Sequence, residues 1–182
     1  MKTESSAAYI ARLAITLLLI TAVVAAGLAC VNAVTAPEIE ALNAQKTQTA
    51  IEAVLPGGGE EIAFTDDSGI VSTIYKGQSG YAVEVTPAGF NGTVTMMVGV
   101  DNAGKVLGIS IVNHTETAGL GAEAASQGAA GTAFRGQFAG MSGSVSVSKY
   151  GGQVDALTGA TITSRAVCTG VNAALNAVAK LG

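Results

Sequence analysis

The C-terminal part of the chain contains the run Asp-Ala-Leu-Thr-Gly-Ala-Thr-Ile-Thr-Ser at residues 155–164. Apolar residues recur at helical spacing over the 21 residues Thr161–Leu181, so we expect a helix that begins at Thr161. Gly159 and Ala160 carry little or no side chain, and the free N–H groups of a helix start attract anionic oxygens. The same run holds four hydroxyl residues: Thr158, Thr161, Thr163 and Ser164. The run therefore predicts a phosphate site, although such residues are also common at ordinary helix starts.

A second run, His-Thr-Glu-Thr-Ala-Gly-Leu-Gly at residues 114–121, contains the only histidine of the chain. From the residues alone, His114 and Glu116 fit a general acid and base, or ordinary loop residues that bond to the backbone. A zinc site needs three or four protein ligands, and one histidine without a nearby cysteine pair provides too few. The sequence therefore predicts no metal site.

Together, the two runs resemble those of one family. This family comprises the FMN-binding domains of the G subunit of Rnf-type ion-translocating electron transport complexes and of a relative, the C subunit of the sodium-translocating NADH:quinone oxidoreductase. In it, a pattern like Asp-x-x-(Ser/Thr)-Gly-Ala-Thr carries FMN through its phosphate. The resemblance implies that a flavin transferase attaches FMN to Thr161 as a phosphoester. The transferase would recognise the preceding motif residues Asp155, Thr158, Gly159 and Ala160.

The His-x-Glu-Thr run matches a second pattern of the same family, which usually has Pro at the position of Ala118. The resemblance places this run near the flavin, and the missing Pro changes the rigidity of the turn more than its chemistry. No catalytic side chain is expected, because the redox chemistry belongs to the flavin. The residues expected to bind the cofactor are Thr161, Asp155, Thr158, Gly159, Ala160, Thr163, His114, Glu116, Thr117, Leu120 and Gly121.

The N-terminal part of the chain is apolar enough for a membrane anchor. No charged residue interrupts Ala14–Val31, and with the preceding turn the span approaches the roughly 20 residues needed to cross a bilayer. Lys2 and Arg12 precede most of the span and acidic residues follow it, which places the N-terminus in the cytoplasm. The segment is longer than the apolar region of a cleaved signal peptide, and Cys30 lacks the aliphatic residue expected three positions before a lipidated cysteine.

The remainder of the chain predicts an α+β fold with a mainly antiparallel sheet and flanking helices. Four segments rich in Val, Ile, Thr and Tyr are separated by short turns: 70–75, 81–86, 93–100 and 106–112. A helix is expected over Pro37–Val54, a short helix carrying Phe134 and Phe138 within 122–140, and a further strand over Ser144–Ser148. We expect a cytoplasmic N-terminus at 1–9, a transmembrane helix at 10–32, a helical linker at 33–60 and an extracytoplasmic FMN-binding domain at 61–182.

Charge and composition exclude several classes of function. Beyond residue 32, seven Lys and Arg stand against twelve Asp and Glu, so the outer domain has no basic surface for nucleic acid. Aromatic residues make up 4% of the chain, so a flavin ring is expected to lie mainly on aliphatic and backbone surface. Cys30 and Cys168 imply no disulfide, and Cys168 is expected to be a small apolar residue on a helix face.

The resemblance implies a covalently flavinylated electron carrier in a cell-membrane complex that couples ferredoxin and NAD redox chemistry to ion movement. Its expected partners are the other subunits, the flavin transferase and the membrane. Three alternatives remain open from the sequence. The chain could be a stand-alone extracytoplasmic flavin carrier, the C subunit of the sodium-translocating enzyme, or a membrane-tethered binding module without redox activity.

Overall fold

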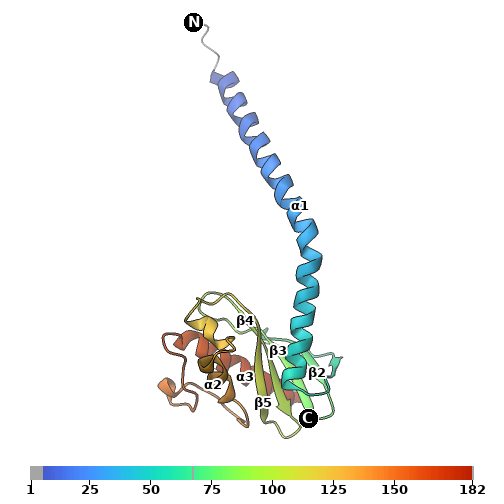
Figure 1. The fold of residues 1–182 in the computed structure, drawn as a ribbon, viewed down its shortest axis with the longest axis vertical. Helices are drawn as coiled ribbons and strands as arrows, with labels where there is room; N and C mark the ends of the chain where they lie inside the picture. Colours follow the sequence, from blue (N-terminus) through green and yellow to red (C-terminus); the bar gives the residue numbers. More distant parts are fainter. Residues whose placement is uncertain (1–5, 67, 182) are drawn as a thin grey trace. The chain divides into compact units, whose positions relative to one another are not determined.

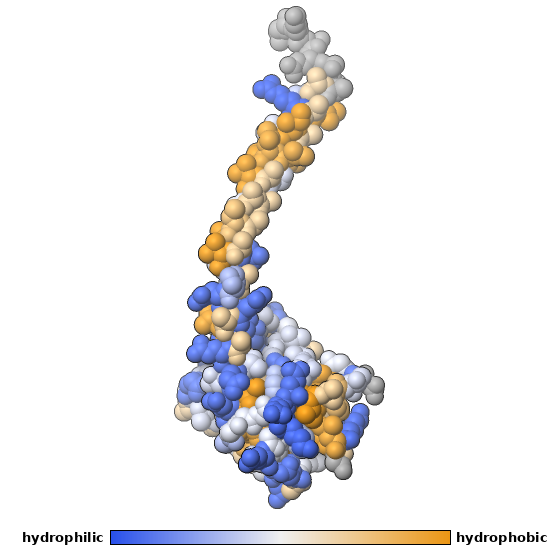
Figure 2. All heavy atoms as spheres, turned by 90° about the vertical axis from the view of Figure 1, so that its right-hand side faces the viewer, coloured by the Kyte–Doolittle hydropathy of each residue, from blue (hydrophilic) through white to orange (hydrophobic). Residues whose placement is uncertain are grey.

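The computed structural model describes residues 6–66 and 68–181, and the chain divides into two compact units, 1–44 and 45–182. One long helix, α1 (Ser6–Val54), supplies the described part of the first unit and continues into the second. Within the described residues, α1 is the one helix long and apolar enough to cross a membrane. Over Ala8–Val54, an 18-residue window reaches a mean hydropathy of 2.6, and none of that window is buried. Figure 2 shows the apolar stretch in orange and the polar residues that follow it in blue.

The helix expected over residues 37–54 is present as the continuation of the same helix. Pro37 lies inside α1, where it removes one backbone hydrogen bond without ending the helix. Apolar spacing therefore predicted the helical state correctly, but it gave no sign that the two helical segments are continuous.

Five antiparallel strands follow one another in space in the same order as in the sequence. They are β1 (Glu60–Ile62), β2 (Val71–Lys76), β3 (Gly80–Val85), β4 (Val94–Asp101) and β5 (Val106–His114). The four predicted strands are confirmed, with ends that differ by no more than two residues. The short edge strand β1 was not predicted; it pairs with β2 through Ile62 and Ile74. The short turns between strands explain the antiparallel neighbours.

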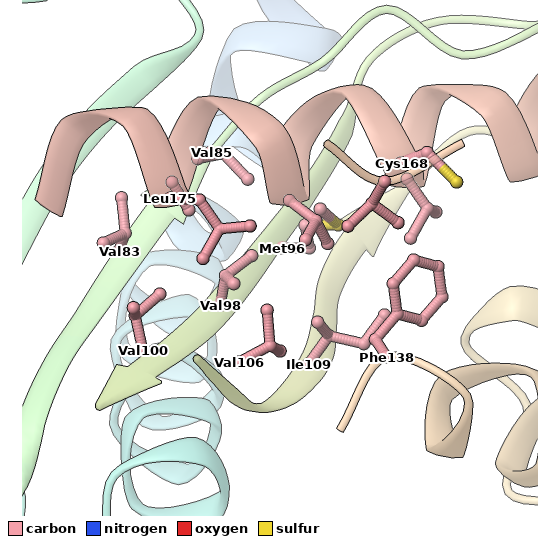
Figure 3. Close-up of a cluster of buried hydrophobic side chains, with 14 of the residues drawn as sticks. Val83, Val85, Met96, Val98, Val100, Val106, Ile109, Phe138, Cys168 and Leu175 are labelled. Atoms are coloured by element: carbon pink, nitrogen blue, oxygen red, sulfur yellow. The ribbon is translucent and has the colours of Figure 1, made fainter. Parts of the chain in front are cut away.

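The C-terminal helix α3 (Thr161–Leu181) covers one face of the sheet. Figure 3 shows the apolar side chains between them: Val83 and Val85 from β3, Met96 and Val98 from β4, and Leu175 from α3 point into one cluster. Alternate residues of each strand reach this face, as the period of two requires. Cys168 is buried in the same cluster, as expected, and burial raises the pKa of its thiol to about 11.

The last turns of α1 pack on the opposite face of the sheet. Ile51, Val54 and Leu55 form a second buried cluster with Ala82 and Met97. Gly99 of β4 permits the close approach, because a Cβ at that position would collide with the Val54 carbonyl oxygen. The sheet is therefore packed between two helical segments (Figure 1).

The segment between β5 and α3 contains short helical elements. A 3₁₀ turn, η1 (Gly121–Ala124), precedes α2 (Ala129–Gly136), and the Phe134 and Phe138 rings meet edge to face with centroids 5.4 Å apart. The expected short helix is confirmed for Phe134, whereas Phe138 lies two residues beyond the end of α2; both rings are buried in the core. The region also contains a second 3₁₀ turn, η2 (Ser148–Tyr150).

The strand predicted over Ser144–Ser148 is wrong. Val145 and Val147 are buried, so the alternation of apolar and polar residues is real. However, Val145 exchanges both of its backbone hydrogen bonds with the side-chain amide of Asn172, at 2.8 Å each. Val147 forms only an isolated bridge with Val154. A side chain of α3 thus takes the place of a neighbouring strand.

Candidate cofactor site

The turn that precedes α3 is closed by its own hydrogen bonds. The Ser164 hydroxyl accepts the Leu157 N–H at 3.0 Å and donates to the Ala160 carbonyl at 3.0 Å. The Ala160 N–H donates to the Leu157 carbonyl at 3.0 Å, while Gly159 adopts a φ of +75°, which favours glycine. These bonds fix the start of α3. The first turn of this helix begins at Thr161, and its N–H groups have no partner within the helix.

Glu116 connects three segments that are far apart in the sequence. Its Oε1 accepts the backbone N–H groups of Phe90 and Asn91 at 2.8 and 3.1 Å, and its Oε2 accepts the Thr163 hydroxyl at 2.5 Å. Its own N–H donates to Nδ1 of His114 at 3.3 Å. The carboxylate thus ties the β3–β4 link and the loop after β5 to the start of α3.

Burial and hydrogen bonding act in opposite directions on Glu116. Desolvation raises the pKa of this carboxyl, because only 8% of the residue is exposed. The bonds from Thr163, Asn91 and Phe90, together with the attraction of His114, outweigh that effect and lower the pKa below its ordinary value of 4.5. Glu116 is therefore a buried carboxylate at neutral pH.

These three segments enclose a cavity of about 310 Å³, which we call the Thr161 cavity. It is lined by Phe90, Glu116, Thr117, Leu120, Gly121, Gly159, Ala160, Thr161, Ile162 and Thr163. Eight of the eleven residues predicted to bind the cofactor are in this lining. Gly121 is required in its wall, since a Cβ at that position would collide with Oε2 of Glu116.

A neighbouring cavity of about 370 Å³ contains two more of the predicted residues, Asp155 and Thr158. We call it the Asp155 cavity; Leu120 also lines it. Asp155 is held there through its backbone, which exchanges hydrogen bonds of 2.7 and 3.2 Å with the side-chain amide of Gln137. His114 lines neither cavity and reaches the site through its bond with the Glu116 backbone.

The sequence comparisons agree with this geometry. The pattern of the FMN-binding domain family matches residues 89–176, which include both cavities. The G subunit of an ion-translocating oxidoreductase complex from Methanosarcina acetivorans is 32% identical, over 93% of this chain and 94% of its own. The chain belongs to the G-subunit family of ion-translocating oxidoreductase complexes. It carries an FMN-binding domain, and with its long apolar helix it is a membrane protein.

Two further members of this family show that its complexes differ in the transported ion. The G subunit of the Na⁺-translocating ferredoxin:NAD⁺ oxidoreductase complex of Acetobacterium woodii is 35% identical, over 88% of this chain and 87% of its own. The G subunit of the proton-translocating complex of Clostridium ljungdahlii is 39% identical, over 54% of this chain and 52% of its own. Similarity at this level therefore does not assign sodium or protons to this member.

The residues of the Thr161 cavity fit an FMN group. Its volume lies at the lower end of the about 300–1,000 Å³ that is usual for ligand pockets, so a bound flavin would remain partly exposed. The start of α3 offers N–H groups to a phosphate, and the apolar side chains of the wall offer a surface to the ring. Bound FMN would supply the electron-transfer chemistry, while these residues would hold and orient it.

Two residues of the Thr161 cavity were not among the predicted set. Phe90 is 66% exposed and Ile162 is 44% exposed, although both are large and apolar. Ile162 follows Thr161 directly, within the stretch whose apolar residues predicted the helix. Phe90 lies in the turn Gly-Phe-Asn-Gly at residues 89–92, and a single aromatic residue in a turn gives no sequence signal for a binding site.

Proposed function

We propose that this chain is an electron-transfer subunit that carries FMN covalently on Thr161. It would serve a membrane complex that couples ferredoxin:NAD oxidoreduction to ion translocation, as the name of the Acetobacterium woodii relative states for that protein. The observation that carries the proposal is the position of Thr161. It lies at the first residue of α3 and lines the cavity, and among the described residues its hydroxyl makes no hydrogen bond.

The other hydroxyls of the run are less suited to the attachment. The Thr163 hydroxyl donates to Glu116, and the Ser164 hydroxyl is fully buried within the turn. The Thr158 hydroxyl belongs to the Asp155 cavity. Thr161 is partly exposed and therefore accessible to a transferase, and its phosphate would lie beside the N–H groups of the first turn of α3.

The chain itself supplies position and electrostatics rather than acid–base or nucleophilic catalysis. Thr161 would hold the phosphate, while the side chains of Leu120, Phe90 and Ile162 would contact the ring. Covalent attachment is useful on the outer side of a membrane, because it keeps a cofactor at high effective concentration that would otherwise be lost by dilution.

The proposed topology places 1–9 in the cytoplasm, 10–32 in the membrane, 33–60 as a helical linker and 61–182 outside. Lys2 and Arg12 against Glu38 and Glu40 support this orientation. An impermeant reagent applied to intact cells is therefore expected to label a tag at the C-terminus and to leave a tag at the N-terminus unlabelled. The reverse result would contradict the orientation.

The attachment can be tested on the full-length chain co-expressed with a flavin transferase. On a denaturing gel, the wild-type band is expected to fluoresce under ultraviolet light, and mass spectrometry is expected to find FMN on the peptide that contains Thr161. Thr161→Ala is expected to abolish the fluorescence. Thr169→Ala, an exposed threonine two turns along the same helix, is the matched control and should keep it. A dark wild-type band, or fluorescence that persists in Thr161→Ala, would contradict the proposal.

Membership of a complex is tested separately, by purification from the native membrane. Co-purification of other redox subunits is expected if the chain serves an ion-translocating complex. A flavinylated chain that purifies alone under mild detergent would favour the stand-alone carrier.

A further inference from the structure

Glu116 is the only charged residue in the lining of the Thr161 cavity, among the described residues. The other lining residues are apolar, glycine or threonine. No Lys or Arg of that lining is available to neutralise the carboxylate. The single negative charge of the cavity therefore lies within its wall and next to Thr163, two residues from the proposed attachment point.

The hydrogen-bond partners of Glu116 favour its ionised form over a form that could donate a proton. Its two oxygens together accept from two backbone N–H groups and from the Thr163 hydroxyl. The two N–H groups cannot accept a proton, so Oε1 must stay an acceptor, and a proton on Oε2 would have to be donated to the Thr163 hydroxyl in a reversal of the present bond. His114 is the one other titratable group of the loop, and it offers Nδ1 to the Glu116 N–H rather than a proton to the carboxylate. The charge is thus a fixed part of the wall.

We propose that Glu116 lowers the redox potential of the flavin in the Thr161 cavity by placing a permanent negative charge beside it. The inference rests on the proposed function, since it requires FMN at Thr161. Reduction adds electrons to the ring, and a nearby buried negative charge opposes this because little solvent screens it. Charge placed near the flavin ring is one of the means by which a protein tunes this cofactor. Glu116 would thus have two roles. Its charge would tune the flavin, and its hydrogen bonds position the three walls of the cavity.

The test is the midpoint potential of the flavinylated full-length protein, measured by spectroelectrochemical titration in detergent. Glu116→Gln keeps the shape of the side chain and an oxygen for the Phe90 and Asn91 N–H groups, while Thr163 can accept from its amide. This variant is expected to shift the potential to a more positive value. Glu61→Gln removes the same charge from β1 at the far edge of the sheet, and its potential should equal that of the wild type.

Thr163→Val separates the charge from the hydrogen bonds. It removes the donor to Oε2 but keeps the carboxylate, so the potential should stay at the wild-type value or become more negative. If Thr163→Val moves the potential to the positive side, wall geometry rather than charge sets it, and the proposal is wrong. This variant keeps the proposal open to refutation even if Glu116→Gln is poorly flavinylated.

The two proposals fail in different ways. A wild-type chain without a fluorescent band on the denaturing gel refutes the attachment at Thr161. A Glu116→Gln chain with a normal fluorescent band and an unchanged potential refutes the tuning role of Glu116 and leaves the attachment intact.

Discussion

Replacement of Thr163 by Val is expected to destabilise the domain by about 1.5–3 kcal/mol, the usual contribution of a hydrogen bond to a charged group. Val has nearly the shape of Thr, so the change puts a methyl group against Oε2 of Glu116 where the hydroxyl donated at 2.5 Å. Thr163 is 1% exposed and Glu116 is 8% exposed, so water has little access to replace the lost donor. With a urea m-value of about 1–3 kcal/mol/M, the unfolding midpoint should fall by about 1 M.

The assay is pulse proteolysis of the full-length chain in detergent across a urea series, read on a gel. This readout suits a chain that contains no Trp for fluorescence. The control is Thr169→Val on the exposed side of α3, where the hydroxyl bonds only to the Arg165 carbonyl within the same helix. Its midpoint should stay close to that of the wild type. Equal midpoints for Thr163→Val and Thr169→Val at neutral pH would refute the assigned role of the bond between Thr163 and Glu116.

The dependence on pH has a defined sign. The folded-state pKa of Glu116 lies below its ordinary value of 4.5, so the stabilisation that its ionised form provides is complete above 4.5. It is lost as the pH falls from that value through the folded-state pKa. The stability difference between wild type and Glu116→Gln should therefore be largest at neutral pH and shrink below pH 4.5. A difference that grows on acidification would contradict this reasoning. Two further predictions concern the walls of the Thr161 cavity. Gly121→Ala would force a Cβ against Oε2 of Glu116, and we expect a loss of about 1–3 kcal/mol and less bound flavin per chain. Gly108→Ala, whose Cβ meets no atom within 4 Å, is its control, and equal stability of the two variants would argue against the contact. Phe90→Ala should change stability by less than about 0.5 kcal/mol because the ring is exposed, yet iodide should quench the flavin more strongly. An unchanged quenching constant would show that the ring does not shield the flavin.

The strands and the C-terminal helix were predictable because burial on one face leaves a period in the sequence. Val83 and Val85 alternate with side chains of the opposite face, and α3 repeats its apolar residues at helical spacing over most of its length. The edge strand β1 was not predictable in this way. It has three residues, of which only Ile62 packs on the core, and so it shows no alternation.

The strand expected over residues 144–148 shows the limit of such patterns. Alternation reports that every second residue is buried, but it does not report what accepts the backbone hydrogen bonds. Here the side-chain amide of Asn172 accepts the Val145 N–H and donates to the Val145 carbonyl. Asn172 lies 27 residues further along the chain. A contact of this kind is set by the packing of α3 and leaves no local signal.

The sequence predicted which residues belong to the candidate site, but not how these residues are arranged around cavities. Patterns shared with a family identified the runs 114–121 and 155–164, but not their division between two cavities that share Leu120. Phe90 was missed because it joins the site through its backbone N–H to Glu116, a bond between residues 26 positions apart. Residue type alone carries no information about such a backbone contact.

The position of Thr161 follows from the hydrophobic core rather than from the loops around it. The buried face of α3 packs on the sheet along most of the helix, so the first residue of α3 is held by the same contacts that stabilise the domain. Glu116 then ties the two remaining walls to Thr163. In contrast to these buried contacts, three apolar residues of the cavity lining are exposed and form its outer rim: Phe90, Leu120 and Ile162. A flavin attached at this helix start, as proposed, would be fixed at its phosphate and open at its edge. An electron carrier that must meet both a donor and an acceptor needs that combination.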